Sequence, residues 1–189
     1  MLPNDEKLDP RVKRTRGLIL QSFSGLLGEK GFESISVQDV TDKAQINRAT
    51  FYAHFEDKYK LLDYWIRQMF MQEVEKRMLN ACHYTPENLR NLILAVCEFL
   101  AHLHSECAQP HPQFESLVET QIKKQIYELL TVWLKQSETE IATEIPATVA
   151  TWAIYGLASH WSHTKKRPVL EEFVDEALPL VAVNLEQFA

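Results

Sequence analysis

The sequence predicts an all-α protein. Only 5 of its 189 residues are Gly, and few stretches show the strict polar and apolar alternation of a half-buried strand. Apolar residues recur instead every three or four positions, as they do on one face of a helix. Since 46% of the residues are hydrophobic, the chain can bury one sizeable core or two smaller ones.

The first helix is expected over residues 10 to 30. Asp9 is suited to cap it and Pro10 to occupy its first position. Gly31 then follows as a stop signal, and Phe32 is expected to return to the core. The helical spacing is carried by Leu18, Ile19, Phe23, Leu26 and Leu27.

Residues 36 to 62 organise the rest of the chain. They predict two short helices joined by a tight turn, and then the start of a third helix. Ser36 caps the first, with Asp39 as its capping-box partner, and that helix ends near Ala44. Asn47 caps the second, which runs to about Tyr52.

The second of these helices is too short to be stable alone. Ile46, Phe51 and Phe55 are expected to point inward and fasten it to its neighbours. A short helix that holds an Arg and a Thr outward on buried aromatics has the form of the recognition helix in a helix-turn-helix.

The remaining chain predicts further helices, about nine in all. Prolines and polar breaks separate these segments, and Pro179 predicts a kink or boundary in the last of them. The expected segments are 57 to 80, 87 to 105, 114 to 137, about 145 to 164, and 171 to 186, with a break over 107 to 113.

At first sight, the formal net charge of -6 opposes binding of an anionic partner. However, residues 1 to 65 hold ten Lys or Arg and ten Asp or Glu, so the excess of acid lies in the remainder. Four basic residues, Arg11, Lys13, Arg14 and Arg16, cluster without an acid among them. A local basic face, and not the charge of the whole chain, decides whether phosphates are attracted.

Three cysteines without CxxC spacing indicate neither a disulfide framework nor a zinc site. The first residues lack the apolar run of a signal peptide, and no window reaches the length of a membrane span. We therefore expect a soluble, cytoplasmic protein without a membrane partner.

Catalytic and metal-binding patterns are weak. The sequence has no nucleophile elbow, Gly-rich phosphate loop or paired-carboxylate pattern, so we expect neither an enzyme nor a cofactor. His102 and His104 lie near Cys107, and His160 and His163 are three residues apart. Positions 102 and 104 face different sides of a helix and no carboxylate completes a set, so we expect no metal site.

The run DVTDKAQINRATFYAHFEDKYKLL, residues 39 to 62, resembles the signature of the TetR family of bacterial transcriptional repressors. One departure is Gln45, which stands where the family usually has Gly in the turn between the two helices. If that turn requires a positive φ, Gln45 carries strain of about 1 kcal/mol. The resemblance implies a DNA-binding domain over residues 1 to 56 and a helical ligand-binding and dimerisation domain over 57 to 189.

Arg48 is the leading base reader, because an Arg can donate two hydrogen bonds to O6 and N7 of guanine. A phosphate contact or a solvated side chain is the alternative for it. The exposed end of the same helix carries further candidates, and Gln38 matches a family position that reaches the groove. The full set of expected base-reading residues is Gln38, Asn47, Arg48, Ala49 and Thr50.

Backbone contacts set the register of a protein on DNA without reading its sequence. Ser36, Tyr52, His54 and Lys58 are the expected phosphate contacts, each able to donate a hydrogen bond. The alternatives are a core aromatic with a solvent-reaching hydroxyl for Tyr52 and a tucked surface histidine for His54. Residues 11 to 16 follow phosphates, enter a minor groove or form a solvated arm.

The resemblance also supplies a homodimer and a small-molecule effector of unknown identity. A nearly uncharged helix and the final helix would form the dimer interface, with Trp152, Tyr155, Gly156, Trp161 and Leu178 in it. The body would enclose the effector, and its candidate lining residues are Trp65, Met69, Cys97, His104 and Trp133.

The expected function is therefore that of a repressor that binds a pseudo-palindromic double-stranded DNA operator and is released by its effector. The alternative is a protein-interaction module or co-regulator of the same fold with weak or no DNA binding. The acidic body and the departure at Gln45 favour that alternative, whereas Arg48, Tyr52, His54 and Lys58 favour the repressor.

Overall fold

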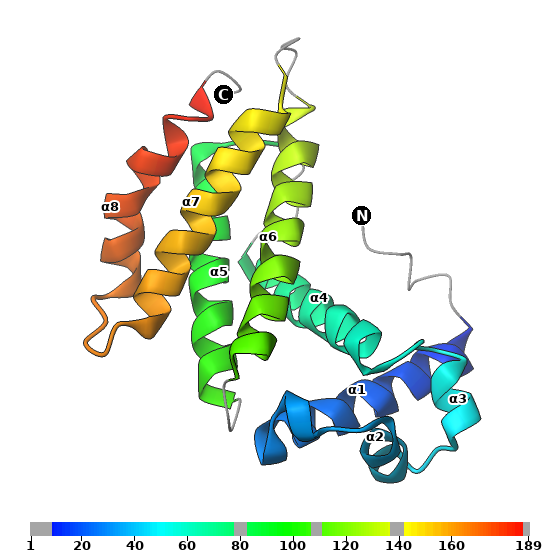
Figure 1. The fold of residues 1–189 in the computed structure, drawn as a ribbon. Helices are drawn as coiled ribbons and strands as arrows, with labels where there is room; N and C mark the ends of the chain where they lie inside the picture. Colours follow the sequence, from blue (N-terminus) through cyan, green and yellow to red (C-terminus); the bar gives the residue numbers. More distant parts are fainter. Residues whose placement is uncertain (1–8, 78–82, 107–110, 137–141, 187–189) are drawn as a thin grey trace. The chain divides into compact units, whose positions relative to one another are not determined.

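The computed structural model describes residues 9–77, 83–106, 111–136 and 142–186. Within these ranges the chain forms eight α-helices, one short 3-10 helix and no strand, so the all-α prediction is confirmed (Figure 1). The helices are α1 (Pro10–Lys30), α2 (Val37–Ala44), α3 (Arg48–Tyr52), α4 (Lys58–Arg77), α5 (Pro86–Glu106), α6 (Pro112–Leu134), α7 (Glu144–His163) and α8 (Leu170–Ala182), with the 3-10 helix η2 (Phe32–Ser34) after α1.

The expected boundaries of α1, α2 and α3 are confirmed, but others differ. Helix α6 begins at Pro112, inside the expected break, because Pro is well suited to the first position of a helix. Helix α8 passes through Pro179 undivided and ends at Ala182, so the described residues hold eight α-helices and not about nine. The expected helix ends at Asn80 and Ser137, and Cys107, lie outside the described residues.

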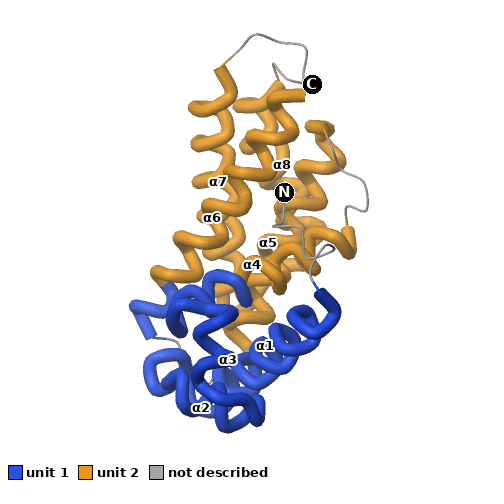
Figure 2. The backbone as a smooth tube through the Cα atoms, turned by 90° about the vertical axis from the view of Figure 1, so that its right-hand side faces the viewer, with its two compact units in different colours: residues 1–65, 106–115 blue, residues 66–105, 116–189 orange. Residues whose placement is uncertain are grey.

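The chain divides into two compact units (Figure 2). Unit 1 comprises residues 1–65 and 106–115, and unit 2 comprises residues 66–105 and 116–189. Helices α4 and α6 each contribute residues to both units.

The core of unit 1 is aromatic. Phe23 is fully buried, and its ring meets Phe32 and Trp65 edge to face, with centroids 6.3 and 6.2 Å away. Phe32 also lies 6.0 Å from the ring of Phe114, which belongs to the first turn of α6. Phe32 thus returns to the core, as its position after Gly31 predicts.

Unit 2 has an aliphatic core that α5 dominates, since the side chains from Leu92 to Cys97 are all buried. Phe70 of α4 and Phe99 of α5 pack edge to face in it. Helices α7 and α8 lie side by side (Figure 1). Among the described residues, no helix combines the length and apolar character needed to cross a membrane.

The turn between α2 and α3 has a positive φ at Gln45, which is the case in which the sequence predicts strain. Gln45 has φ 54° and ψ 44°, and it is the non-glycine residue with positive φ among those described. The turn is closed by hydrogen bonds from the amide of Gln45 to the carbonyl of Asp42 and from Ile46 to Thr41. Gln45 therefore bears the steric cost that Gly would avoid.

Gln45→Gly is expected to stabilise the protein by about 0.5 to 1 kcal/mol, because relief of left-handed strain exceeds the extra chain entropy of glycine. Urea unfolding followed by circular dichroism measures this change. Gln72→Gly is the matched control: Gln72 is also exposed but lies inside α4, so glycine there should cost about 1 kcal/mol. A loss of stability in Gln45→Gly would contradict the assigned strain.

Candidate nucleic-acid interface

Helices α2 and α3 form the candidate interface in unit 1. Gln38 and Ser36 are exposed on α2 and at its cap, and Arg48 and Ala49 are exposed on α3. Thr50 is half-buried. The structure thus brings the expected base-reading residues together on two consecutive elements.

Aromatic packing holds α3 in place. Phe51 is fully buried and Phe55 nearly so, and their ring centroids are 6.0 Å apart. Tyr52 meets Phe51 edge to face but remains 49% exposed. One part of Tyr52 thus packs on the core while the rest of its side chain reaches the surface.

The side chain of Arg48 lies along Tyr52. Its Nη2 donates to the Tyr52 hydroxyl at 3.3 Å, and the guanidinium carbon is 5.9 Å from the centre of the tyrosine ring. This contact limits the rotamers of a long exposed side chain. Arg48 keeps most of its donors for another acceptor, since a guanidinium has five.

Asn47 caps α3 and is largely engaged there. Its Oδ1 accepts from the amide of Thr50 at 2.7 Å and from the Thr50 hydroxyl at 2.9 Å. The outward groups left to this pair are the amide nitrogen of Asn47 and the methyl of Thr50, which suits contact with a thymine methyl.

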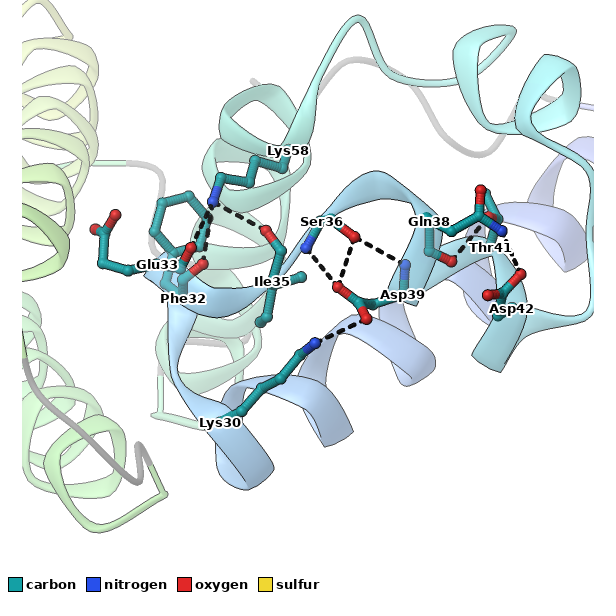
Figure 3. A network of polar contacts seen from close by, with 10 residues as sticks. All are labelled: Lys30, Phe32, Glu33, Ile35, Ser36, Gln38, Asp39, Thr41, Asp42 and Lys58. Atoms are coloured by element: carbon teal, nitrogen blue, oxygen red, sulfur yellow. Dashed lines mark hydrogen bonds and ion pairs between the residues drawn. The ribbon is translucent and has the colours of Figure 1, made fainter.

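Gln38 has a fixed amide orientation. Its Nε2 donates to Oδ1 of Asp42 at 2.6 Å (Figure 3). A carboxylate accepts hydrogen bonds only, so the amide nitrogen must face Asp42 and Oε1 is left to accept. In this conformation Gln38 can accept from an adenine N6 or a cytosine N4 amino group.

The start of α2 is closed by a complete capping box (Figure 3). The amide of Ser36 donates to Oδ2 of Asp39 at 2.7 Å, and the amide of Asp39 donates to the Ser36 hydroxyl at 3.2 Å. Lys30 lies 2.8 Å from the second oxygen of Asp39. The bonds to Lys30 and Ser36 hold the pKa of Asp39 well below its usual range.

The first turn of α4 is also capped by its own chain. Oδ1 of Asp57 accepts from the amides of Tyr59 and Lys60, both at 2.8 Å. Amides at a helix N-terminus can attract a phosphate, but these two already have an acceptor.

Lys58 differs from the other expected phosphate contacts. It is half-buried, and its ammonium donates to the carbonyl oxygens of Phe32, Glu33 and Ile35 at 3.2, 3.2 and 2.9 Å (Figure 3). In this conformation it fastens the start of α4 to η2 and to the residue before the cap of α2.

His54 is half-buried beside Arg16. Burial first, and the charge of Arg16 second, lower the pKa of His54 below its ordinary value of 6.5. The guanidinium of Arg16 lies 5.2 Å from the ring centre of Tyr64 and 6.0 Å from that of Phe55. Arg16 thus packs against aromatic side chains of unit 1. Neither a solvated arm nor a phosphate contact requires such packing.

Three of the five expected effector-lining residues, Trp65, Cys97 and Trp133, are in the core. Cys97 and Trp133 are fully buried, while Met69 and His104 are half-buried. Burial raises the pKa of the Cys97 thiol to about 12, so it stays protonated. Trp65 packs on Phe23 in unit 1, as described above.

Among the described residues no group of three or more His, Cys, Asp or Glu side chains could hold a metal ion. His104 and His163 have ring centroids 4.3 Å apart. Sequence reasoning paired other histidines and missed this contact, because α5 and α7 supply one ring each.

Helices α7 and α8, with the residue that follows α8, present exposed apolar side chains. We call this set of side chains the α7–α8 face. It consists of Ile145, Val149, Trp152, Leu180 and Val183, all exposed. A cavity of about 460 Å³ adjoins it and is lined by Ile145, Pro146, Val149, Val183, Asn184 and Glu186. None of the five expected effector-lining residues lines that cavity.

The residues expected at the dimer interface divide into three groups by exposure. Trp152 is 60% exposed, and a Cβ at exposed Gly156 would meet no atom of its own protomer within 4 Å. Tyr155 and Leu178 are half-buried. Trp161 is only 8% exposed and its indole nitrogen donates to the carbonyl of Pro168, so it belongs to the protomer's own core and not to the α7–α8 face.

The lowered pKa of His54 predicts a loss of stability in mild acid. The folded state binds this proton less readily than the unfolded chain, so stability falls as the pH drops below about 6.5 toward the folded pKa. His54→Gln should reduce the difference in urea midpoint between pH 7.5 and pH 5.5. His160→Gln, at an exposed position of α7, should leave it unchanged, and equal effects of both variants would refute the assignment.

Comparison with known proteins places these features in a family. Residues 19–64 match the family model described as bacterial regulatory proteins, tetR family. An uncharacterised helix-turn-helix regulator of Bacillus subtilis, YxbF, is 38% identical over 65 residues, 34% of this chain and 17% of that protein. The repressor KstR2 of Mycobacterium tuberculosis is 26% identical over 104 residues, 53% of this chain and 52% of that protein. The matched regions span about half the length of these curated relatives, or less.

Solved structures share the fold over nearly the whole chain. A TetR-family regulator of Streptomyces coelicolor superposes with a TM-score of 0.67 at 15% identity, covering 94% of this chain and 98% of that one. FadR of Bacillus subtilis, solved with stearoyl-CoA, superposes with a TM-score of 0.56 at 15% identity, covering 89% and 98%. Residues 19–64 thus match the tetR family of bacterial regulatory proteins, and the chain shares the fold of a solved TetR-family regulator.

Proposed function

We propose that this regulator is a repressor that binds a pseudo-palindromic DNA operator as a homodimer and is released by a small-molecule effector. The observation that carries the proposal is the exposed end of α3, where Arg48 projects from a helix fixed by buried Phe51. KstR2, which is similar to 53% of this chain, is a transcriptional repressor.

We assign base reading to Gln38, Asn47, Arg48, Ala49 and Thr50, with Arg48 on a guanine and Gln38 on an amino-bearing base. Tyr52 and His54 are assigned to the DNA backbone, which they would contact through a hydroxyl or an imidazole N–H. Ser36 would donate to a phosphate only by giving up the hydrogen bond from its hydroxyl to Oδ2 of Asp39, at 2.6 Å. Residues 1 to 56 would form the DNA-binding domain, and 57 to 189 the ligand-binding and dimerisation domain.

The α7–α8 face supports the homodimer. Side chains at 145, 149, 152 and 156 repeat at helical spacing, so one stripe of α7 is exposed and apolar or small. Lys123 of α6 lies 3.4 Å from the centre of the Trp152 ring and restrains it at the surface. Two-fold pairing of this face would form a four-helix interface and bury its apolar area.

The effector would act by population shift, binding more tightly to the conformation that cannot hold both half-sites. The relative FadR was solved with an acyl-CoA, and other members of this fold class need not share that ligand. We therefore propose a small organic effector held in the helical body and assign it no closer chemistry.

Arg48→Ala should weaken binding to a duplex spanning the promoter next to the protein's own gene by roughly 10- to 100-fold, because a bidentate Arg to guanine is worth about 1 to 3 kcal/mol. Mobility shift over a range of salt concentrations measures this loss. Arg90→Ala is the control, since Arg90 pairs with Asp175 in unit 2. No sequence-specific shift by the wild type at low salt would favour the interaction-module alternative.

Val149→Asp should dissociate the dimer, because it places a carboxylate in the α7–α8 face. Val132→Asp is closely matched: the two valines are 43% and 46% exposed, and Val132 lies on α6. Light scattering at micromolar concentration should give monomer for the first variant and dimer for the second. A wild type that is itself monomeric, or two variants that behave alike, would contradict the proposed interface.

A further inference from the structure

The side chain of Lys58 makes several contacts with the backbone of preceding elements. It occupies the first position of α4, and its ammonium is within hydrogen-bond distance of three carbonyl oxygens, those of Phe32, Glu33 and Ile35. The same nitrogen lies 4.7 Å from the centre of the Phe32 ring. All these groups belong to unit 1.

The number of donors decides what Lys58 can do. A lysine ammonium has three N–H donors and no acceptor, and three carbonyls receive them here. A phosphate could gain a direct hydrogen bond from Lys58 only if one of these carbonyls lost its partner. Two of these bonds are to partly buried carbonyls, for which such a loss is costly.

The acceptors lie directly before the DNA-facing elements. Phe32 and Glu33 belong to η2, and Ile35 is the residue before Ser36, the cap of α2. The Lys58 ammonium therefore joins the start of α4 to the backbone from which α2 starts. The ion pair between Lys30 and Asp39 also fastens the start of α2 to the end of α1.

We infer that Lys58 is a positioning residue for DNA binding, which sets where α2 begins relative to α4, and that it is not a phosphate contact. The inference rests on the proposed DNA-binding function. It assigns the phosphate contacts of this region to exposed Tyr52 and half-buried His54, and not to Ser36, whose single hydroxyl donor is already given to Oδ2 of Asp39.

Salt dependence separates the two roles. Each phosphate contact contributes about 0.9 to the slope of log K against log salt concentration. With the promoter duplex, Lys58→Met should lower affinity at every salt concentration and leave that slope unchanged. Lys58→Arg should not restore affinity, because a planar guanidinium cannot direct three donors as an ammonium does, although it binds phosphate well. A slope reduced by about 0.9, with rescue by Arg, would overturn the inference.

Amide hydrogen exchange tests the positioning role without DNA. Lys58→Met should accelerate exchange at Ile35 and Val40, whose amides donate to Phe32 and Ser36, and leave α5 and α6 protected. Lys60→Met, an exposed lysine of the same turn, should change neither region. If the wild type fails to bind the duplex, the proposed function fails and exchange alone decides: faster exchange at 35 and 40 supports positioning, and unchanged exchange refutes it.

Discussion

The burial of Phe51 is the interaction on which the candidate interface depends. A helix of five residues cannot repay the entropy of its own nucleation, so α3 exists because its aromatic side chain enters the core of unit 1. The contacts of Phe51 with Phe55 and Tyr52 then fix the helix about its axis. The direction in which Arg48 projects follows from that packing and not from any property of Arg48 itself.

A second constraint is electrostatic. At the starts of α2, α3 and α4, a cap side chain already accepts from one or two of the first amides, which leaves fewer of these amides for an anion. Affinity for a polyanion must then come largely from exposed side chains in a segment with no net charge. This makes the few outward donors of α2 and α3 more important than the formal charge of -6 for the whole chain.

Local chemistry made much of unit 1 predictable. The caps at Asp9, Ser36 and Asn47 involve residues two or three apart. The left-handed residue Gln45 lies in the short gap between the end of α2 and Asn47, the cap of α3, where the sequence predicts a tight turn. Contacts across long sequence separations were not predictable. Lys58 reaches carbonyls 23 to 26 residues away, and the pattern that marks its position carries no information about those acceptors.

The packing of the apolar helices of unit 2 could not be predicted from the sequence either. The composition of α7 indicates burial on more than one side but does not say which apolar residues face the protomer's own core. Trp161 and Trp152 look equivalent in the sequence, yet Trp161 is bonded to the backbone at Pro168 and Trp152 lies at the surface under Lys123. Ile145, Val149, Leu180 and Val183, which complete the exposed face, could be separated from core residues only once the helices were packed.

Helix α4 is long enough to contact η2 at its start and α5 and α6 in its later turns. Its first residue, Lys58, is fastened to η2, and later turns are paired with other helices, through Arg67 with Glu128 of α6 and through Arg77 with Glu98 of α5. These ion pairs are partly exposed, and such pairs contribute little free energy each. Under the proposed mechanism, an effector held in the helical body would therefore need only modest differential affinity to exchange them. The three bonds of Lys58 to backbone carbonyls are harder to exchange, so under the proposed mechanism a displaced α4 would carry the start of α2 with it.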